Sequence, residues 1–295
     1  MSERSIAFKR MVLRLPQSPG DYAAVTVTAK LAELLRIDLV AALVEDATLI
    51  DIAGMPGVRE LRPLEGGWRP MVAEELAREI EHMAGTARRL FAEALRTCSI
   101  EANLSVARGS PADVITSLAM AEDIIVIVEP RNPAERITQQ FTQLVDAAFR
   151  AAAAVMIVPG AIARTTGPIV VIASAPEEAS VKAALGIAAI AKERLIISSL
   201  SRDTTAFAEL AEQARAAGVR CDVVTLAPRP ASASALASGL AGLNERLIVM
   251  NRGTFDDALA GAIASLRRIP VLVTEPDAEK SAAPPPDHGK TASIL

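Results

Sequence analysis

The chain repeats one order of short apolar runs and amphipathic segments, and this repeat limits its possible folds more than any other feature. The runs of the first stretch are Met11–Leu15, Asp123–Val128 and Ala154–Pro159, and those of the second are Ile169–Ala173, Arg246–Met250 and Pro270–Thr274. Short β-branched runs that alternate with amphipathic helices, in an order used twice, are typical of a duplicated α/β domain.

The apolar runs are continuous rather than alternating, which is typical of strands buried on both faces of a parallel sheet. We expect first-half strands at 9–15, 38–46, 100–107, 123–128 and 154–159, with helices at 19–36, 71–97, 110–121 and 133–151. We expect second-half strands at 168–174, 194–200, 219–226, 246–250 and 269–274, with helices at 176–192, 203–217, 231–241 and 254–267. Alternating strands and helices predict right-handed crossovers.

Local signals set the limits of the units. Ser110-Pro111 places a capping residue before a proline that suits the first helical position. Gly218 follows a predicted helix where a C-terminal glycine belongs. We expect domains at 8–159 and 167–275, joined by the short linker 161–168, and a disordered, proline-rich tail at 276–295.

Composition excludes several classes of protein. The net charge is −4 and no lysine- or arginine-rich run is present, which argues against nucleic-acid binding. No apolar run reaches the roughly 18 residues of a membrane span, and the N-terminus lacks the apolar core of a signal peptide. Two cysteines do not make a disulfide framework, so we expect a cytoplasmic protein without membrane contact.

Residues that could catalyse a reaction are scarce. The two histidines, His82 and His288, lie in a predicted helix and in the tail, so no serine or cysteine triad can be argued. No cysteine and histidine cluster has metal spacing, and no glycine-rich phosphate loop is present. We interpret Cys98 and Cys221 as inert thiols. The charged helix around residues 74–89 is interpreted as a solvated face.

Three features, carried by Arg108–Ile115, by Ala121–Val126 and by the pair Ala154–Pro159 and Ile269–Val273, resemble the universal stress protein family in its tandem form. Arg108-Gly-Ser-Pro-Ala-Asp-Val-Ile115 is similar to the family's G-x-P turn before a helix, and Ala121-Glu-Asp-Ile-Ile-Val126 to its acidic residue and fourth strand. Ala154–Pro159 and Ile269–Val273 are similar to its terminal strand. The resemblance implies two tandem five-stranded parallel sheets of strand order 3-2-1-4-5, with helices on both faces. It also implies that the two last strands pair to join the copies.

Many members of this family bind ATP, and the resemblance implies where such a site would lie. The family has an aspartate after the first strand, and G-x-x-G, nine residues and G-[ST] after the fourth. In the first copy the glycine positions fall on Val128, Arg131 and Phe141, and the hydroxyl on Thr142. The aspartate position falls on Pro16.

In the second copy the aspartate position falls on Ser174, and the loop Asn251–Asp257 is about seven residues shorter. Asp256 and Asp257 would repel phosphate there and are more simply helix caps. The motif is therefore lost in both copies, and we expect no ATP and no other cofactor.

The resemblance favours a non-catalytic binding or regulatory protein of the stress response, acting as a scaffold or sensor. A second hypothesis is a binder of a nucleotide or small anion, in an atypical pocket near Arg131, Thr142 and the Gly109 turn. A third is an enzyme that uses carboxylates which the sequence does not locate.

An insertion at 47–70 follows the second predicted strand, at the edge where parallel sheets bind ligands. We expect it to be irregular. It holds the only tryptophan, Trp68, together with Leu64. Long loops in compact domains are often lids or binding loops, so we predict docking of a protein partner or of a second copy through these two residues. The alternative is a packed cover over the adjacent sheet end.

Overall fold

The computed structural model describes residues 8–15, 22–45, 51–62, 66–130, 133–136, 138–152, 154–226, 232–254 and 257–275. The expectations for Pro16, Leu64, Arg131, Asp256 and the tail at 276–295 lie outside the described residues.

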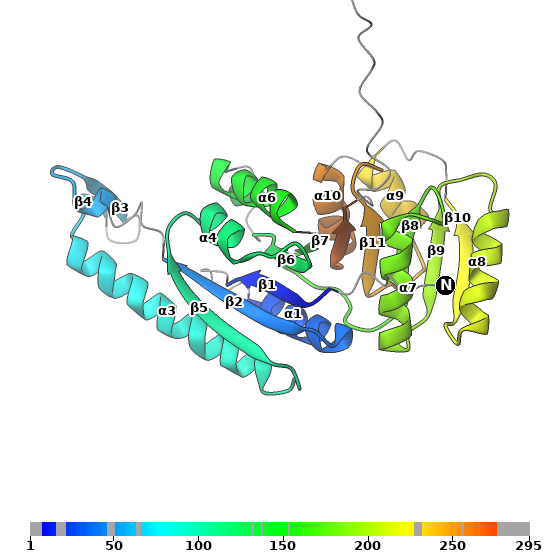
Figure 1. Ribbon diagram of the computed structural model, residues 1–295. Helices are drawn as coiled ribbons and strands as arrows, with labels where there is room; N and C mark the ends of the chain where they lie inside the picture. The colour runs from blue at the N-terminus through cyan, green and yellow to red at the C-terminus, as the bar shows by residue number, and fades with distance from the viewer. Residues whose placement is uncertain are drawn as a thin grey trace, which may run out of the picture.

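The described strands of both halves form one ten-stranded sheet, in the order β10-β9-β8-β11-β12-β7-β6-β1-β2-β5 (Figure 1). The strands of the first half are β1 (Arg10–Arg14), β2 (Asp38–Glu45), β5 (Ala102–Arg108), β6 (Asp123–Val128) and β7 (Ala154–Val158). Those of the second half are β8 (Ile169–Ala173), β9 (Leu195–Ser199), β10 (Cys221–Thr225), β11 (Leu247–Asn251) and β12 (Val271–Thr274). Neighbours within each half are parallel.

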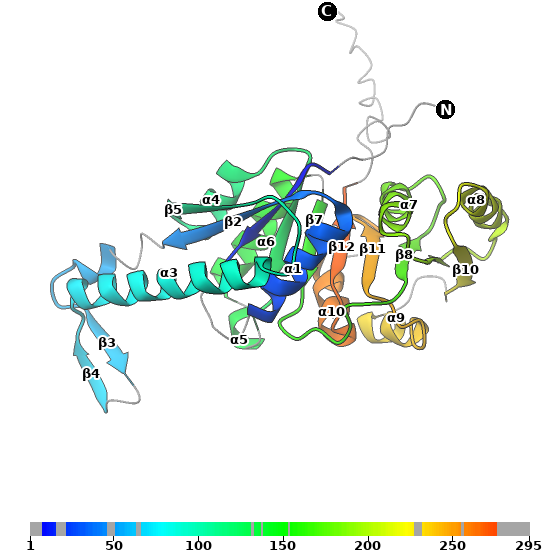
Figure 2. The same cartoon turned by 90° about the horizontal axis from the view of Figure 1, so that it is seen from below.

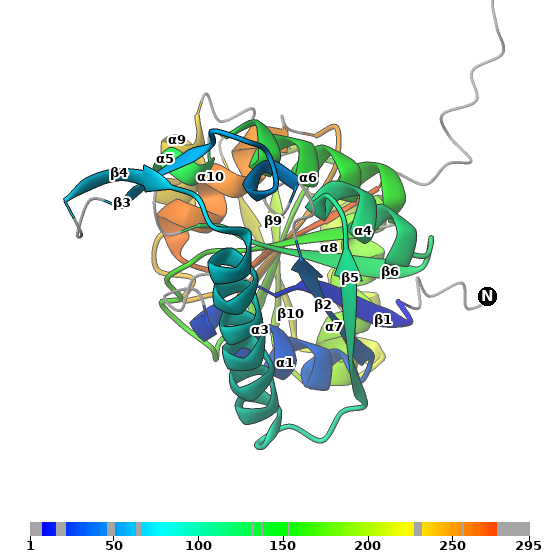
Figure 3. The same ribbon diagram turned by 90° about the vertical axis from the view of Figure 1, so that its left-hand side faces the viewer.

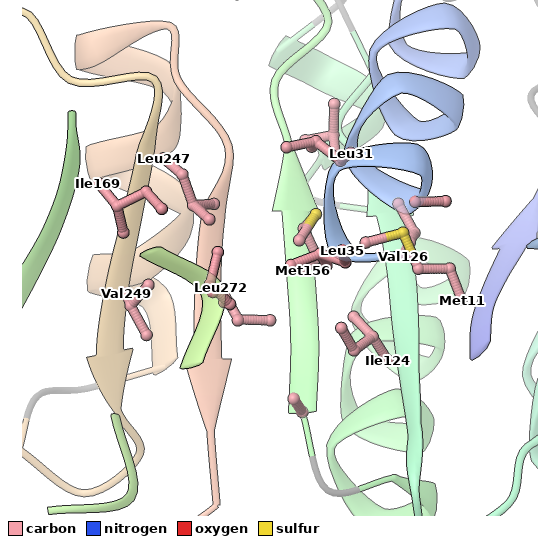
Figure 4. Close-up of a cluster of buried hydrophobic side chains, with 14 of the residues drawn as sticks. Met11, Leu31, Leu35, Ile124, Val126, Met156, Ile169, Leu247, Val249 and Leu272 are labelled. Atoms are coloured by element: carbon pink, nitrogen blue, oxygen red, sulfur yellow. The ribbon is translucent and has the colours of Figure 1, made fainter. Parts of the chain in front are cut away.

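Helices cover both faces of this sheet. One face packs against α1 (Tyr22–Leu35), α3 (Ala73–Leu95), α7 (Ala179–Ala191) and α8 (Thr205–Ala216). The other packs against α4 (Pro111–Leu118), α6 (Gln139–Ala151), α9 (Ala233–Gly239) and α10 (Asp257–Arg267). The core of each face is continuous across the halves, and Figure 4 shows Met156 of β7 and Leu272 of β12 in the same cluster.

The pairing of β7 with β12 departs from the expectation of two separate five-stranded sheets. The two strands are antiparallel, with Met156 opposite Leu272 and Val155 opposite Val273. The predicted pairing of the last strands is therefore confirmed. Because that pairing satisfies the ladder hydrogen bonds of both edges, the two halves merge into one sheet.

Strand order within each half follows the expected 3-2-1-4-5 pattern. In the first half the order is β5-β2-β1-β6-β7, and in the second it is β10-β9-β8-β11-β12. The order reverses between β1 and β6 and again between β8 and β11. Parallel α/β sheets bind ligands outside the carboxyl ends of the strands at such reversals, so these two places are where a site should be sought.

Two expectations about elements were wrong. Part of the insertion is not irregular but an antiparallel hairpin of β3 (Arg59–Arg62) and β4 (Gly67–Pro70). The helix expected at 133–151 is interrupted: a short α5 (Pro133–Arg136) precedes α6, which Thr138 caps by accepting a 3.3 Å hydrogen bond from the Phe141 N–H. A threonine hydroxyl that caps a new helix competes with continuation of the previous one.

The cap predictions are confirmed. The Ser110 hydroxyl accepts a 3.2 Å hydrogen bond from the Asp113 N–H, with Pro111 in the first turn of α4. Gly218 follows α8 with φ of +88°, the left-handed conformation that suits glycine.

The linker is fixed against the second half rather than running free. The Arg246 N–H donates to the Pro168 carbonyl (3.0 Å), and the Ala163 N–H donates to the Arg268 carbonyl (2.8 Å). Gly167 between them has φ of +129°, and a Cβ there would overlap the carbonyl oxygen of Asn244. Only glycine allows this close approach.

We expect Gly167→Ala to lower the free energy of unfolding by about 3 kcal/mol, because it adds backbone overlap to a strained φ. Gly242→Ala is the matched control: its φ is +85° but a Cβ there meets nothing within 4 Å. The control should lower the free energy of unfolding by only about 1–2 kcal/mol, the cost of holding alanine in the left-handed conformation. Urea denaturation of both variants measures the difference, and equal losses would mean that the linker is not held as described.

Candidate functional site

In the first half, large side chains stand where the family has phosphate-binding glycines. Val128 ends β6 and packs against one core cluster, while Phe141 in α6 packs against the other. The exposed Thr142 hydroxyl donates a 3.2 Å hydrogen bond to the Thr138 carbonyl. Backbone N–H groups can approach phosphates closely only where side chains leave room, and Val128 and Phe141 carry side chains that are partly buried against the core clusters.

In the second half, a carboxylate of the chain itself occupies the turn after β8. The Ser174 N–H (2.7 Å) and the Ala175 N–H (3.0 Å) both donate to Glu178 Oε1, and the Ser180 hydroxyl donates to Glu178 Oε2 (3.3 Å). Burial raises the pKa of Glu178 above its usual range, although these hydrogen bonds oppose the shift. An internal anion thus holds the N–H groups at this sheet reversal.

The residues predicted for an atypical anion pocket do not share one strand end. Gly109 directly follows β5, whereas Thr142 lies in α6, after β6. β5 and β6 are three strand positions apart, or about 14 Å at the usual spacing. Arg131 lies outside the described residues. The pocket near Arg131, Thr142 and Gly109 stays a prediction.

Sequence reasoning missed a buried polar network where β6 ends. Glu129 is 5% exposed, and its Oε2 accepts a 2.6 Å hydrogen bond from the Ser265 hydroxyl of α10, in the other half. Arg136 Nη1 donates to that hydroxyl oxygen (2.7 Å), and its Nε donates to the Pro130 carbonyl (2.8 Å). Ser265 both donates and accepts, so its hydroxyl joins Glu129 to Arg136 across the two halves.

Arg252 is the second-half counterpart of Glu129. The Glu129 N–H donates to the Val158 carbonyl at the end of β7, and the Arg252 N–H donates in the same way to the Thr274 carbonyl at the end of β12. Each residue therefore extends the fourth strand of its half by one step along the fifth.

Arg252 also reaches across to the other half. Its Nη1 donates to the Phe149 carbonyl (3.0 Å) and to Glu275 (2.6 Å), and its guanidinium lies 4.7 Å from the centre of the Phe149 ring. Phe149 lies in α6, five residues before β7 begins. Pro270 is the second-half position that corresponds to the start of β7, and Ser265 in α10 lies five residues before it. Phe149 and Ser265 therefore occupy matching positions. Each half thus contacts the last helix of the other half at matching positions. Glu129 makes a hydrogen bond there, whereas Arg252 makes a contact with an aromatic ring.

The thiols show no sign of activation. Burial raises the pKa of Cys221 to about 11, so it stays protonated at neutral pH. Cys98 is half-buried, and its thiol donates to the Ala94 carbonyl. His82 is exposed on α3, and among the residues that the structure describes no group of three metal-binding side chains gathers.

The insertion places Trp68 outside the core. Trp68 is 61% exposed on β4, so it does not act as a packed cover over the sheet. Leu64, its predicted partner in docking, lies outside the described residues.

The Glu129 network predicts a pH dependence. Burial raises the pKa of Glu129, so between its unfolded value (about 4.3) and its folded value the folded chain binds more protons than the unfolded chain. Stability should therefore fall as pH rises through that window. Glu129→Gln keeps an acceptor for Ser265 but cannot ionise, so it should lose part of this slope in urea denaturation across pH. Glu178 would supply the remainder, and an unchanged slope in Glu129→Gln would contradict the assignment.

No protein-family model matches the chain, and no curated protein matches it. Solved structures do. A universal stress protein from Archaeoglobus fulgidus DSM 4304 superposes with a TM-score of 0.66 at 14% identity, over 93% of this chain and 100% of that one. A protein of unknown function from Pseudomonas aeruginosa PAO1 gives 0.48 at 16% identity, over 94% and 95% of the two chains. A proposed universal stress protein from Pseudomonas aeruginosa UCBPP-PA14 gives 0.46 at 15%, over 92% and 95%. At this identity the first likeness establishes the fold: the chain has the α/β fold of universal stress proteins.

Proposed function

We propose that this chain is a non-catalytic binding or regulatory protein of the universal stress protein type, and that it does not bind ATP where relatives do. The observation that carries the proposal is the Glu178 carboxylate of the chain itself at the reversal point of the second half, and side chains at the first-half positions support it. Val128 and Phe141 pack into the cores in the first half, and the Glu178 carboxylate holds two backbone N–H groups in the second.

Electrostatics support the same conclusion for the second half. A phosphate at the turn after β8 would have to displace Glu178, whose carboxylate accepts three hydrogen bonds. If the carboxylate stayed, two anions would share one set of donors, which is unfavourable when both are partly buried.

We further propose that the chain is the tandem form of this fold, with units at 8–159 and 167–275. The strand order supports this: each half contains all five strands in the order 3-2-1-4-5, with its own helices on both faces. The linker between them is short and hydrogen-bonded to the second half.

We place the protein in the cytoplasm. Cys98 lies four residues before the start of β5 and Cys221 begins β10, and these are the two outermost strands at opposite ends of the sheet. Cysteines that far apart cannot form a disulfide, which suits a reducing compartment. No helix among the described residues is long and apolar enough to cross a bilayer.

Titration calorimetry with magnesium–ATP tests the proposal. We expect no heat of binding at sub-millimolar nucleotide, because the positions for phosphate are filled. Thermal-shift measurements with ATP, ADP and AMP should likewise leave the melting temperature unchanged. A micromolar dissociation constant for any of them would contradict the proposal and favour the anion-binding alternative near Arg131.

A further inference from the structure

An arm extends from the first half, beyond the sheet. We define the arm as the β3–β4 hairpin together with residues 72–83, that is, the N-cap residue Val72 and the N-terminal part of α3. Figures 1 and 2 show it projecting from the end of the molecule, and Figure 3 views the molecule from that end.

The helical part of the arm continues an apolar stripe past the point where the core ends. The buried side chains of α3 are Ala84, Ala87, Phe91 and Ala94, all in its second half. Towards the N-terminus the same side of the helix carries Val72, Leu76, Ile80 and Met83, at helical spacing. None of these four belongs to either core cluster of the described residues, and Val72 and Met83 are 40% and 42% exposed.

The hairpin part has an apolar face of its own. Leu61 of β3 lies directly opposite Trp68 of β4, and the two side chains are 53% and 61% exposed. Glu60 and Arg69, the neighbouring opposed pair, point to the other face because side chains alternate along a strand. The Leu61–Trp68 face therefore points away from the ion pairs that Arg69 makes.

Those ion pairs hold the arm in one shape. Arg69 Nε pairs with Glu60 (2.5 Å), and its Nη2 pairs with Glu75 in the first turn of α3 (2.7 Å). The Arg59 guanidinium also donates to the Trp68 carbonyl (2.9 Å). Hairpin and helix are thus connected, which lowers the entropy cost of presenting their apolar faces to a partner.

The arm is incomplete as a free structure. A two-stranded hairpin is marginal in water unless its apolar face is covered. Of the nine large apolar side chains exposed on the described residues, five lie between Met55 and Met83. A cluster of that kind marks an interaction surface rather than scattered surface residues.

We propose that the arm binds the arm of a second copy of this chain, as a two-fold symmetric pair. A single arm presents two different apolar faces, the hairpin face and the helix stripe. One two-fold rotation lets each hairpin cover the other copy's stripe, so that both faces are buried at once. This is the self-complementarity that a symmetric dimer requires.

Charge supports a second copy as the occupant. Arg59 lies two residues before Leu61 on β3 and therefore shares the face of Leu61 and Trp68, whereas residues 73–83 carry four glutamates and one arginine. Arg59 is exposed on the hairpin, and Glu74 and Glu81 are exposed on the helix. In the proposed dimer the hairpin of each copy lies on the helix stripe of the other copy, so a basic hairpin faces an acidic helix at both contacts. This charge match favours the two-fold arrangement over other orientations of the two copies. The proposal does not depend on whether the chain binds nucleotide.

Trp68 is the only tryptophan, so its fluorescence reports on the arm directly. Sedimentation velocity of the full chain over a concentration series should show a monomer–dimer equilibrium. The Trp68 emission maximum should move to shorter wavelength over the same concentrations, because dimerisation removes its indole from water. Trp68→Ala should raise the dimer dissociation constant at least about tenfold, as the loss of a central aromatic anchor does.

Ile190→Ala is the matched control, since Ile190 is 43% exposed on α7, far from the arm in the chain, and its truncation should leave the dissociation constant unchanged. Met83→Lys tests the helix stripe and keeps the tryptophan: it should weaken the dimer and leave the emission at longer wavelength. If Trp68→Ala fails to fold, Met83→Lys still tests whether the arm forms the dimer contact. A chain that stays monomeric at every concentration overturns the proposal, even if it binds a different protein. So does a dimer that Trp68→Ala and Met83→Lys leave unchanged, or one that forms without a shift in emission.

Discussion

The antiparallel pairing of β7 with β12 determines the arrangement of everything else in the molecule. Strands within each half are parallel, so this one antiparallel junction turns the two halves in opposite directions. The carboxyl ends of β1 and β6 therefore lie at one end of the sheet, and those of β8 and β11 lie at the other. Strands of about five residues separate these ends by roughly 17 Å. No small ligand could contact both reversal points at once. A ligand site at one reversal point must therefore be built without residues from the other reversal point.

The contacts that flank this junction specify which halves pair. Glu129 meets Ser265 and Arg252 meets Phe149, at matching positions of the two halves. If two first halves from different chains paired in the same way, each Glu129 would face a Phe149 ring and lose its hydroxyl donor. A buried carboxylate without a donor is costly. If two second halves paired, Arg252 would lose its aromatic partner. The chemistry thus favours the pairing of unlike halves within one chain, and any assembly of chains must use another surface.

The elements that the sequence predicted are determined by neighbouring residues, whereas those it missed depend on single side chains or on residues far apart in the chain. β6 was predicted with its observed bounds, because five β-branched residues in a row, Ile124–Val128, leave few alternatives. The hairpin was missed because β3 and β4 hold one large apolar side chain each, Leu61 and Trp68, among charges, glycine and proline. The break before α6 depends on one hydroxyl, that of Thr138. The Glu129 network could not be predicted at all, since its hydrogen bond to Ser265 joins residues 136 positions apart.

The arm and the two reversal points differ in whether the chain's own side chains are packed or left exposed. At the reversal point of the second half the Glu178 carboxylate accepts hydrogen bonds from two N–H groups of the chain itself, and in the first half Phe141 packs against one core cluster. In the arm the chain does the reverse, leaving its one tryptophan in water although aromatic residues are only 3% of the chain. A side chain of that size contributes strongly to folding when buried, so its exposure on a hairpin held by Arg69 is better explained by binding than by folding. The arm is therefore the surface that we propose for recognition.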